Sequence, residues 1–174
     1  MAVDTLFSLV MFISTMLLDK DKNTLITATC RNTPNYPLCV ATLQSDPRSS
    51  AAGAGAGVET LGLVMVSAVK ARAVEITQAI PPLKAAKPEW AQPLSQCYFY
   101  YDAVLRADVP EAEMALKRGV PKFAEAGMAD AAVEAASCDG AFKNGGITES
   151  PLKDFNDNVV QLSGVATSII KMLL

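Results

Sequence analysis

Histidine is absent from this chain of 174 residues. Its absence removes Ser–His and Cys–His nucleophile pairs, zinc sites that use imidazole, and the usual general base near neutral pH. Most hydrolase mechanisms thereby lose a member. We expect a protein that is not an enzyme, and we expect no cofactor.

Positive charge is scarce as well. Lys and Arg total 15 against 18 Asp and Glu, which gives a formal net charge of −3. Because a nucleic-acid binder needs a basic face to neutralise phosphates, nucleic acid is not an expected partner. With 51% hydrophobic residues, the chain suits one domain with a continuous core.

No apolar run reaches the ~20 residues that cross a bilayer, so no stable membrane span is expected. The run Thr5–Leu18 ends in charges, and it predicts a secretory signal peptide over residues 1–22, followed by a mature domain over 23–174. Asp4 stands where such a leader usually carries Lys or Arg. A buried N-terminal helix or an uncleaved anchor therefore stays an alternative.

Cysteine occurs four times, at Cys30, Cys39, Cys97 and Cys138. An even count behind a signal-like segment is typical of an oxidising compartment, and the spacing fits no metal ribbon. Sequence spacing leaves three pairings open. A bridge between Cys30 and Cys39 would clamp the turn between them by roughly 2 to 3 kcal/mol of loop entropy.

Strand-like alternation of apolar and polar residues is missing too. Residues 23–45 instead predict a helical hairpin, with helices at Asn23–Thr29 and Tyr36–Ser45 around the turn-like RNTPNYP. The Gly- and Ala-rich residues 46–57 predict a flexible loop. Residues 58–174 then carry apolar side chains at helical spacing.

Four bundle helices are expected in residues 58–174. The first helix begins at Val58 and stops at Pro81-Pro82, and the second runs from near Glu89 or Leu94 to Arg118 with a kink at Pro110. The third helix spans residues 121–142. Thr148 or Ser150 caps the fourth helix. Short turns between them predict an all-α fold, an up-down-up-down four-helix bundle preceded by the hairpin.

Two side-chain clusters have ordinary structural interpretations. The acidic residues around the Pro110 kink are expected to form a solvated helix face rather than an acid–base pair. The aromatic run YFYY, residues 98–101, is expected to lie in the core and rim of the bundle. The acidic residues are Asp102, Asp108, Glu111 and Glu113.

The stretch GVPKFAEAGM, residues 119–128, allows two interpretations. In one, Pro121 starts a helix, Lys122 is solvated and Phe123 closes the end of the core. In the other, Lys122 and Phe123 project as a probe that contacts a partner through a cation and an aromatic ring.

From about Thr29 to its C-terminus the chain resembles the plant invertase inhibitors and pectin methylesterase inhibitors. The resemblance rests on TCRNTPNYPLC with its two cysteines, on TLGLVMVSAVKARA, on the later Cys97 and Cys138, and on VVQLSGVATSIIKMLL. It implies the pairings Cys30–Cys39 and Cys97–Cys138, and a disulfide-clamped hairpin that extends from the bundle.

Within that family, inhibitors of cell-wall invertase carry a Pro-Lys-Phe motif at the junction of the second and third bundle helices. Pro121-Lys122-Phe123 stands at the matching place. The resemblance therefore implies an inhibitor of acid invertase, a β-fructofuranosidase, in which Lys122 enters the acidic sucrose cleft and Phe123 adds apolar contact. It also implies secretion to the apoplast and cell wall, or alternatively to the vacuole.

Two other functions stay open. A pectin methylesterase inhibitor would share the fold and the cysteines but would dock through its bundle helices. A helical binding module with no enzyme target would inhibit neither enzyme.

Overall fold

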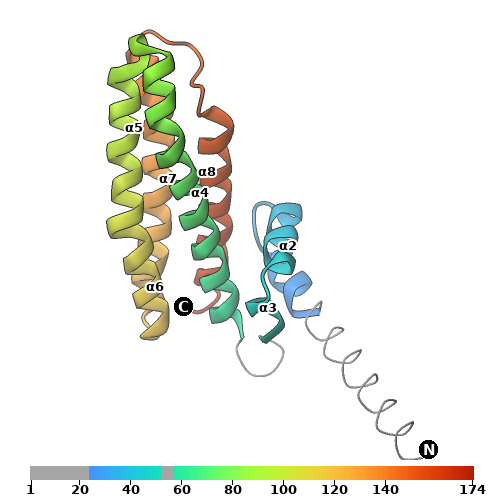
Figure 1. Cartoon of the computed structure of the whole chain (residues 1–174). Helices are drawn as coiled ribbons and strands as arrows, with labels where there is room; N and C mark the ends of the chain where they lie inside the picture. The colour runs from blue at the N-terminus through green and yellow to red at the C-terminus, as the bar shows by residue number, and fades with distance from the viewer. Residues whose placement is uncertain (1–23, 52–56) are drawn as a thin grey trace, which may run out of the picture.

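The structure, a computed structural model, describes residues 24–51 and 57–174. All regular elements in these ranges are helical, as the sequence predicts. Long helices form a bundle, and a helical hairpin lies at its side (Figure 1). The predicted signal peptide over residues 1–22 and residues 52–56 of the predicted loop lie outside the described residues.

The bundle is built from four arms, one of which is bent. The helices are α4 (Val58–Ala86), α5 (Ala91–Ala103), α6 (Val109–Lys117), α7 (Pro121–Asn144) and α8 (Lys153–Lys171). α5 and α6 make up one arm, because only a short π-helix separates them. α4 packs against α5 and α8, and α7 packs against α5, α6 and α8. The predicted all-α bundle fold is confirmed.

Pro81 and Pro82 do not stop the first helix, so this prediction was wrong. α4 continues past both prolines, and both are exposed. The carbonyls of Thr77 and Gln78 lose their N–H partners, but neither residue is buried, so water can bind them. Leu83 packs against the core beyond the prolines, and this contact favours continued helix.

The predicted irregularity at Pro110 is confirmed, and it takes the form of a π-helix rather than a simple kink. The π-helix spans Val104–Asp108. The N–H of Val109 donates to the carbonyl of Val104, five residues back. A wider turn of this kind bends the arm just before Pro110, whose ring cannot supply an N–H.

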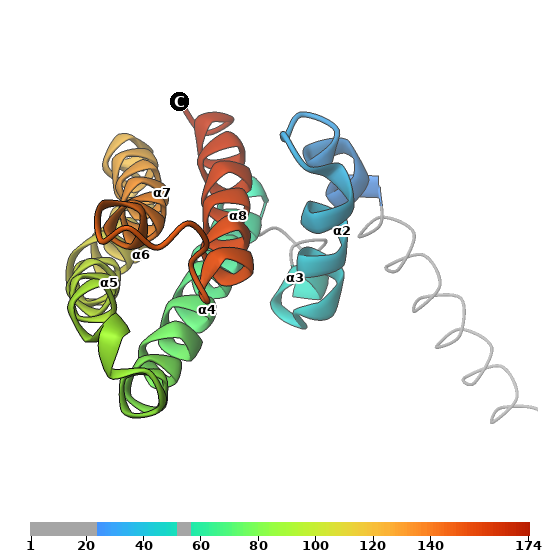
Figure 2. The same ribbon diagram turned by 90° about the horizontal axis from the view of Figure 1, so that it is seen from above.

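The N-terminal hairpin consists of helical residues 24–30 and α2 (Tyr36–Ser45). The disulfide Cys30–Cys39 joins its two helices, as the resemblance implied. Asn35 caps α2, and its Nδ2 donates to Oε1 of Gln161 on α8 at 2.6 Å. The hairpin lies beside α4 and α8, on the side away from α5 and α7 (Figure 2).

Part of the predicted loop at 46–57 is a short helix, α3 (Arg48–Ala51). The guanidinium of Arg48 pairs with the carboxylate of Asp46 at 2.6 Å and also donates to Ser67 on α4 at 3.1 Å. These contacts tie the segment to the bundle. The prediction of a flexible loop was therefore wrong for residues 48–51.

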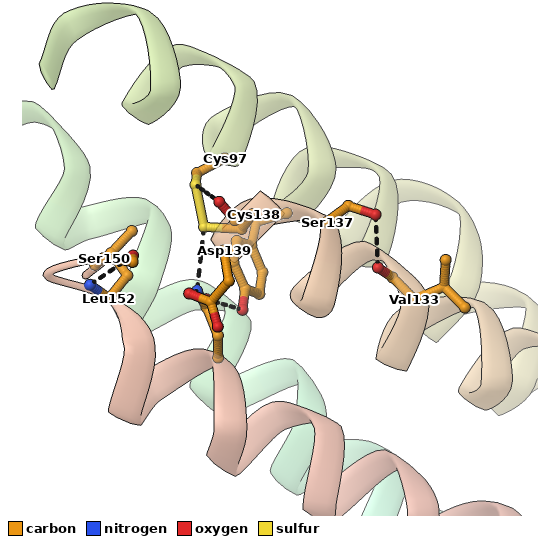
Figure 3. The surroundings of a disulfide bond; sticks show 9 residues. Cys97, Val133, Ser137, Cys138, Asp139, Ser150 and Leu152 are labelled. Carbon is orange, nitrogen blue, oxygen red and sulfur yellow. Dashed lines mark hydrogen bonds between the residues drawn. A yellow bond between two sulfur atoms is a disulfide. The ribbon is translucent and has the colours of Figure 1, made fainter. Parts of the chain in front are cut away.

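A second disulfide, Cys97–Cys138, joins α5 to α7, as the resemblance also implied (Figure 3). Beside it, the amide of Asn156 on α8 donates to Oδ1 of Asp139 at 2.6 Å. Asn156 also accepts a hydrogen bond from the hydroxyl of Tyr101 on α5. Three helices are thus fixed together at this level of the bundle.

Candidate functional site

The turn between α6 and α7 reverses the chain within a few residues. Gly119 has a φ of 68°, in the left-handed region that favours glycine. The N–H of Val120 donates to the carbonyl of Ala115 and that of Gly119 to the carbonyl of Leu116, both at 3.0 Å. This pair of hydrogen bonds ends α6 and leaves Pro121 free to start α7 at once.

Lys122 and Phe123 project from the first turn of α7. The Lys122 side chain is 75% exposed and Phe123 is 58% exposed. Pro121 therefore starts a helix as the first interpretation predicts, but Phe123 does not close the core, and that part of the prediction was wrong. We call residues 119–123 the tip.

Several helices pack together next to the tip and support it. Figure 1 shows the end of α6 and the C-terminal end of α8 at the same end of the bundle. A Cβ on Gly62 of α4 would lie 3.5 Å from Leu116 and 3.6 Å from Ile170. α4 therefore approaches α6 and α8 closely behind the tip.

Lys122 belongs to an ionic cluster of three residues. Its ammonium donates to Oε2 of Glu125 at 2.7 Å, and Lys171 at the end of α8 approaches Oε1 of Glu125 at 3.3 Å. The Glu125 side chain is only 15% exposed. The hydrogen bond from Lys122, and then that from Lys171, hold the pKa of Glu125 below its usual value.

Phe123 also borders a shallow apolar groove. Its lining residues come from α6, the turn and the first turn of α7: Glu111, Met114, Ala115, Arg118, Val120 and Phe123. Met114 and Val120 are exposed apolar side chains of this groove. With Lys122 and Arg118 nearby, the tip offers an apolar contact area next to positive charge.

The acidic residues near Pro110 behave differently from one another. Asp102 pairs with Arg106 at 2.7 Å and Glu113 with Lys70 at 3.4 Å, as expected for a solvated face. Asp108 is only 9% exposed, and its Oδ2 has no hydrogen-bond partner within the described part of the chain. The prediction of a solvated face was therefore wrong for Asp108.

Burial raises the pKa of Asp108 to about 7, and the charges of Asp130, Glu134 and Glu111 add to this effect. No group of three Cys, Asp or Glu side chains in residues 24–51 and 57–174 could hold a metal ion. Over the same ranges, no helix is both long and apolar enough to cross a membrane.

Comparison of the chain with models of protein families shows which family it belongs to. Residues 24–169 match the family described as plant invertase/pectin methylesterase inhibitor. The chain belongs to this family. The match covers the hairpin, the bundle and the tip together.

One curated protein that is similar to this chain is the cell wall/vacuolar inhibitor of fructosidase 1 of Arabidopsis thaliana. The two are 38% identical over 148 residues, which is 85% of this chain and 68% of the relative. The relative's name refers to two compartments, the cell wall and the vacuole.

Two solved structures share the fold of this family member. One is a mutant form of a pectin methylesterase inhibitor from Arabidopsis, with a TM-score of 0.69 and 19% identity over 83% of this chain and 94% of the other. The second is a pectin methylesterase inhibitor from Arabidopsis thaliana, with a TM-score of 0.61 and 18% identity over 86% and 95%. At this identity the likeness concerns the fold.

Sequence reasoning placed Pro121, Lys122 and Phe123 at the start of a bundle helix, but it missed Glu125 and Lys171. The Lys122–Glu125 spacing of three is a signal that helix geometry could have supplied. Lys171 lies 46 positions after Glu125 in the sequence. Only the packing of α7 on α8 brings these two together.

Proposed function

We propose that this protein is an inhibitor of plant acid invertase and not itself an enzyme, and that Pro121, Lys122 and Phe123 occupy the acidic sucrose-binding cleft of the target. One observation carries the proposal. Lys122 and Phe123 are exposed side by side at one end of the bundle in a family member whose curated relative is named an inhibitor of fructosidase.

The physical basis is charge complementarity combined with a pre-ordered backbone. A glycoside hydrolase works with a pair of carboxyl groups, so its cleft attracts an ammonium group. Pro121 fixes its own φ and the Gly119 turn fixes the approach, so little backbone entropy is lost on docking. Phe123 supplies apolar contact area beside the charge.

The disulfides and the relative bear on the compartment. Two disulfides within the described residues suit an oxidising environment. We propose secretion to the apoplast and cell wall, with the vacuole as the alternative, because the relative carries both places in its name.

A specific surface favours the second candidate, inhibition of pectin methylesterase. Phe99 on α5 is 71% exposed and Tyr98 beside it is also exposed, so a bundle helix presents aromatic side chains to solvent. Tyr101 of the same run is buried, as predicted, but the prediction that the run lies in the core and rim of the bundle was wrong for Phe99. An inhibitor that docks through its bundle helices would use this α5 face rather than the tip.

The test is a side-by-side titration of the purified, oxidised protein against an acid invertase and a pectin methylesterase at mildly acidic pH. We expect inhibition of invertase, loss of at least about tenfold in affinity for Lys122→Ala, and a similar loss for Phe123→Ala. Lys143→Ala, an exposed lysine at the other end of α7, is the matched control and should inhibit as the wild type does.

Three results would change the assignment. Inhibition of the esterase alone, weakened by Phe99→Ala and not by Lys122→Ala, would support the second candidate. Full invertase inhibition by Lys122→Ala would mean that the tip is only a helix start. Inhibition of neither enzyme would favour a non-inhibitory binding module.

A further inference from the structure

The carboxylate of Glu125 binds two lysines that reach it from different helices. Oε2 accepts from Lys122 of the same helix at 2.7 Å, while Oε1 lies 3.3 Å from Nζ of Lys171 on α8. Both lysine side chains are more than half exposed, whereas Glu125 is largely covered. The acid is therefore the fixed member of the cluster, and the two cations are the movable ones.

The contact with Glu125 competes with any use of Lys122 in binding. Glu125 lies three residues further along α7 than Lys122, so their pair draws the ammonium along the helix and away from the tip. A partner's carboxylate that faces the tip would have to replace Glu125. The Lys122 end of this pair is mostly in solvent, and an ion pair with a hydrated partner is weak, so such a replacement is feasible.

If Lys122 left without a substitute, Glu125 would keep its negative charge next to an acidic partner. The hydrogen bond from Lys171, which does not depend on Lys122, also lowers the pKa of Glu125 and so favours its charged form. A shielded carboxylate without a cation is unfavourable, and like charges across an interface oppose association. Lys171 already touches the other oxygen of the same carboxylate, so it can neutralise this charge without any rearrangement of the backbone.

We propose that Glu125 holds Lys122 in the free protein, and that Lys171 retains the Glu125 carboxylate when Lys122 transfers to an acidic group of the target. Glu125 and Lys171 are thus positioning residues for Lys122, and neither has to touch the target. This inference rests on the proposed function of the tip.

The proposal predicts effects of opposite sign for the two residues. Glu125→Gln keeps the shape but releases Lys122, so inhibition of invertase should become about threefold tighter. Lys171→Met keeps the apolar stem but leaves Lys122 as the remaining cation of the cluster. Transfer of Lys122 to the target would then leave the Glu125 carboxylate without a cation, so inhibition should become about fivefold weaker. Lys171→Arg should restore the wild-type value, because it keeps the charge.

Simple long-range attraction to an acidic cleft would give the same two signs, so the decisive measurement is a double-mutant cycle. In the Glu125→Gln background, Lys171→Met should change the inhibition constant by less than about twofold. Lys117→Met is the matched control, because Lys117 is exposed at the end of α6 and makes no ion pair among the described residues. Its small effect should be equal in both backgrounds.

The outcomes separate this inference from the proposed function. If Lys122→Ala abolishes inhibition but Lys171→Met weakens it equally in the wild-type and Glu125→Gln backgrounds, the tip is functional and the proposed handover is wrong. If Lys122→Ala has no effect, the proposed function fails and the handover with it. Thermal unfolding of each variant shows whether a loss of inhibition reflects a loss of fold.

Discussion

The hydroxyl of Tyr101 on α5 donates a hydrogen bond of 2.7 Å to Oδ1 of Asn156 on α8, and both side chains are fully buried. Buried polar groups stabilise a fold when they are paired and destabilise it when one partner is removed. The amide of Asn156 is occupied as well, by Asp139. This cluster therefore fixes α5 and α8 at one register next to the Cys97–Cys138 disulfide.

Asn156→Ala should lower the free energy of unfolding by about 2 to 4 kcal/mol, because it opens a cavity and leaves the Tyr101 hydroxyl without an acceptor. Tyr101→Phe should lower it by about 1 to 2 kcal/mol, since only the hydroxyl is lost. Urea unfolding of both variants and of the double variant measures the coupling. Additive losses would show that the hydrogen bond contributes nothing of its own.

α7 approaches the bent arm closely at Gly127. A Cβ at this position would lie 2.6 Å from the backbone carbonyl oxygen of Asp108, which cannot turn away as a side chain could. We expect Gly127→Ala to destabilise the fold by about 2 to 3 kcal/mol, despite the better helix propensity of alanine.

Gly140 in the same helix is the control, because a Cβ there would meet nothing within 4 Å among the described residues. Gly140→Ala should stabilise the protein by about 0.5 to 1 kcal/mol through helix propensity alone. Thermal or urea unfolding of the two variants tests the contrast. A neutral Gly127→Ala would mean that α7 can move away from the π-helix at little energetic cost.

The bundle could be predicted because each long helix has a local signal in the sequence. The apolar spacing, the Gly119 turn and the Ala-rich stretch after Pro121 all act within a few residues of where they stand. Family resemblance added the disulfide pairings, which spacing alone left open. Exposed Lys122 and Phe123 lie at the predicted helix junction for the same local reason.

The remaining features depend on contacts between segments far apart in the sequence. α3 forms where composition favours a loop, because Arg48 reaches Ser67 on α4. Residues around Pro81 stay helical because Leu83 has a core to pack against. Lys171 meets Glu125 only once α8 has closed against α7. No local pattern in the sequence encodes these contacts.

The two disulfides should differ in their contribution to stability. The Cys97–Cys138 bridge closes a separation of 41 residues and the Cys30–Cys39 bridge one of 9. Replacing the first pair by alanine should cost about 3 to 4 kcal/mol of unfolding free energy, and replacing the second about 2 to 3 kcal/mol. Denaturant unfolding of the two double variants measures this order.

The second double variant also tests whether the hairpin matters for inhibition. The hairpin packs on α4 and α8, whereas the tip joins α6 to α7. We therefore expect Cys30→Ala/Cys39→Ala to inhibit invertase as the wild type does at a temperature where it is folded. A loss of inhibition in folded protein would place the hairpin in the interface.

Asp108 should make the protein more stable in acid than at neutral pH. Its pKa is raised from 3.8 to about 7, first by burial and then by Asp130, Glu134 and Glu111, so the folded state binds this proton more tightly than the unfolded state. The stabilisation is complete below the unfolded pKa and is lost as pH rises through the folded one. The free energy of unfolding should fall by about 1 to 3 kcal/mol between about pH 4 and pH 8.

Asp108→Asn should remove most of this dependence of stability on pH, and Asp102→Asn, on the same arm, should keep it. An unchanged slope in Asp108→Asn would assign the pH dependence to other groups.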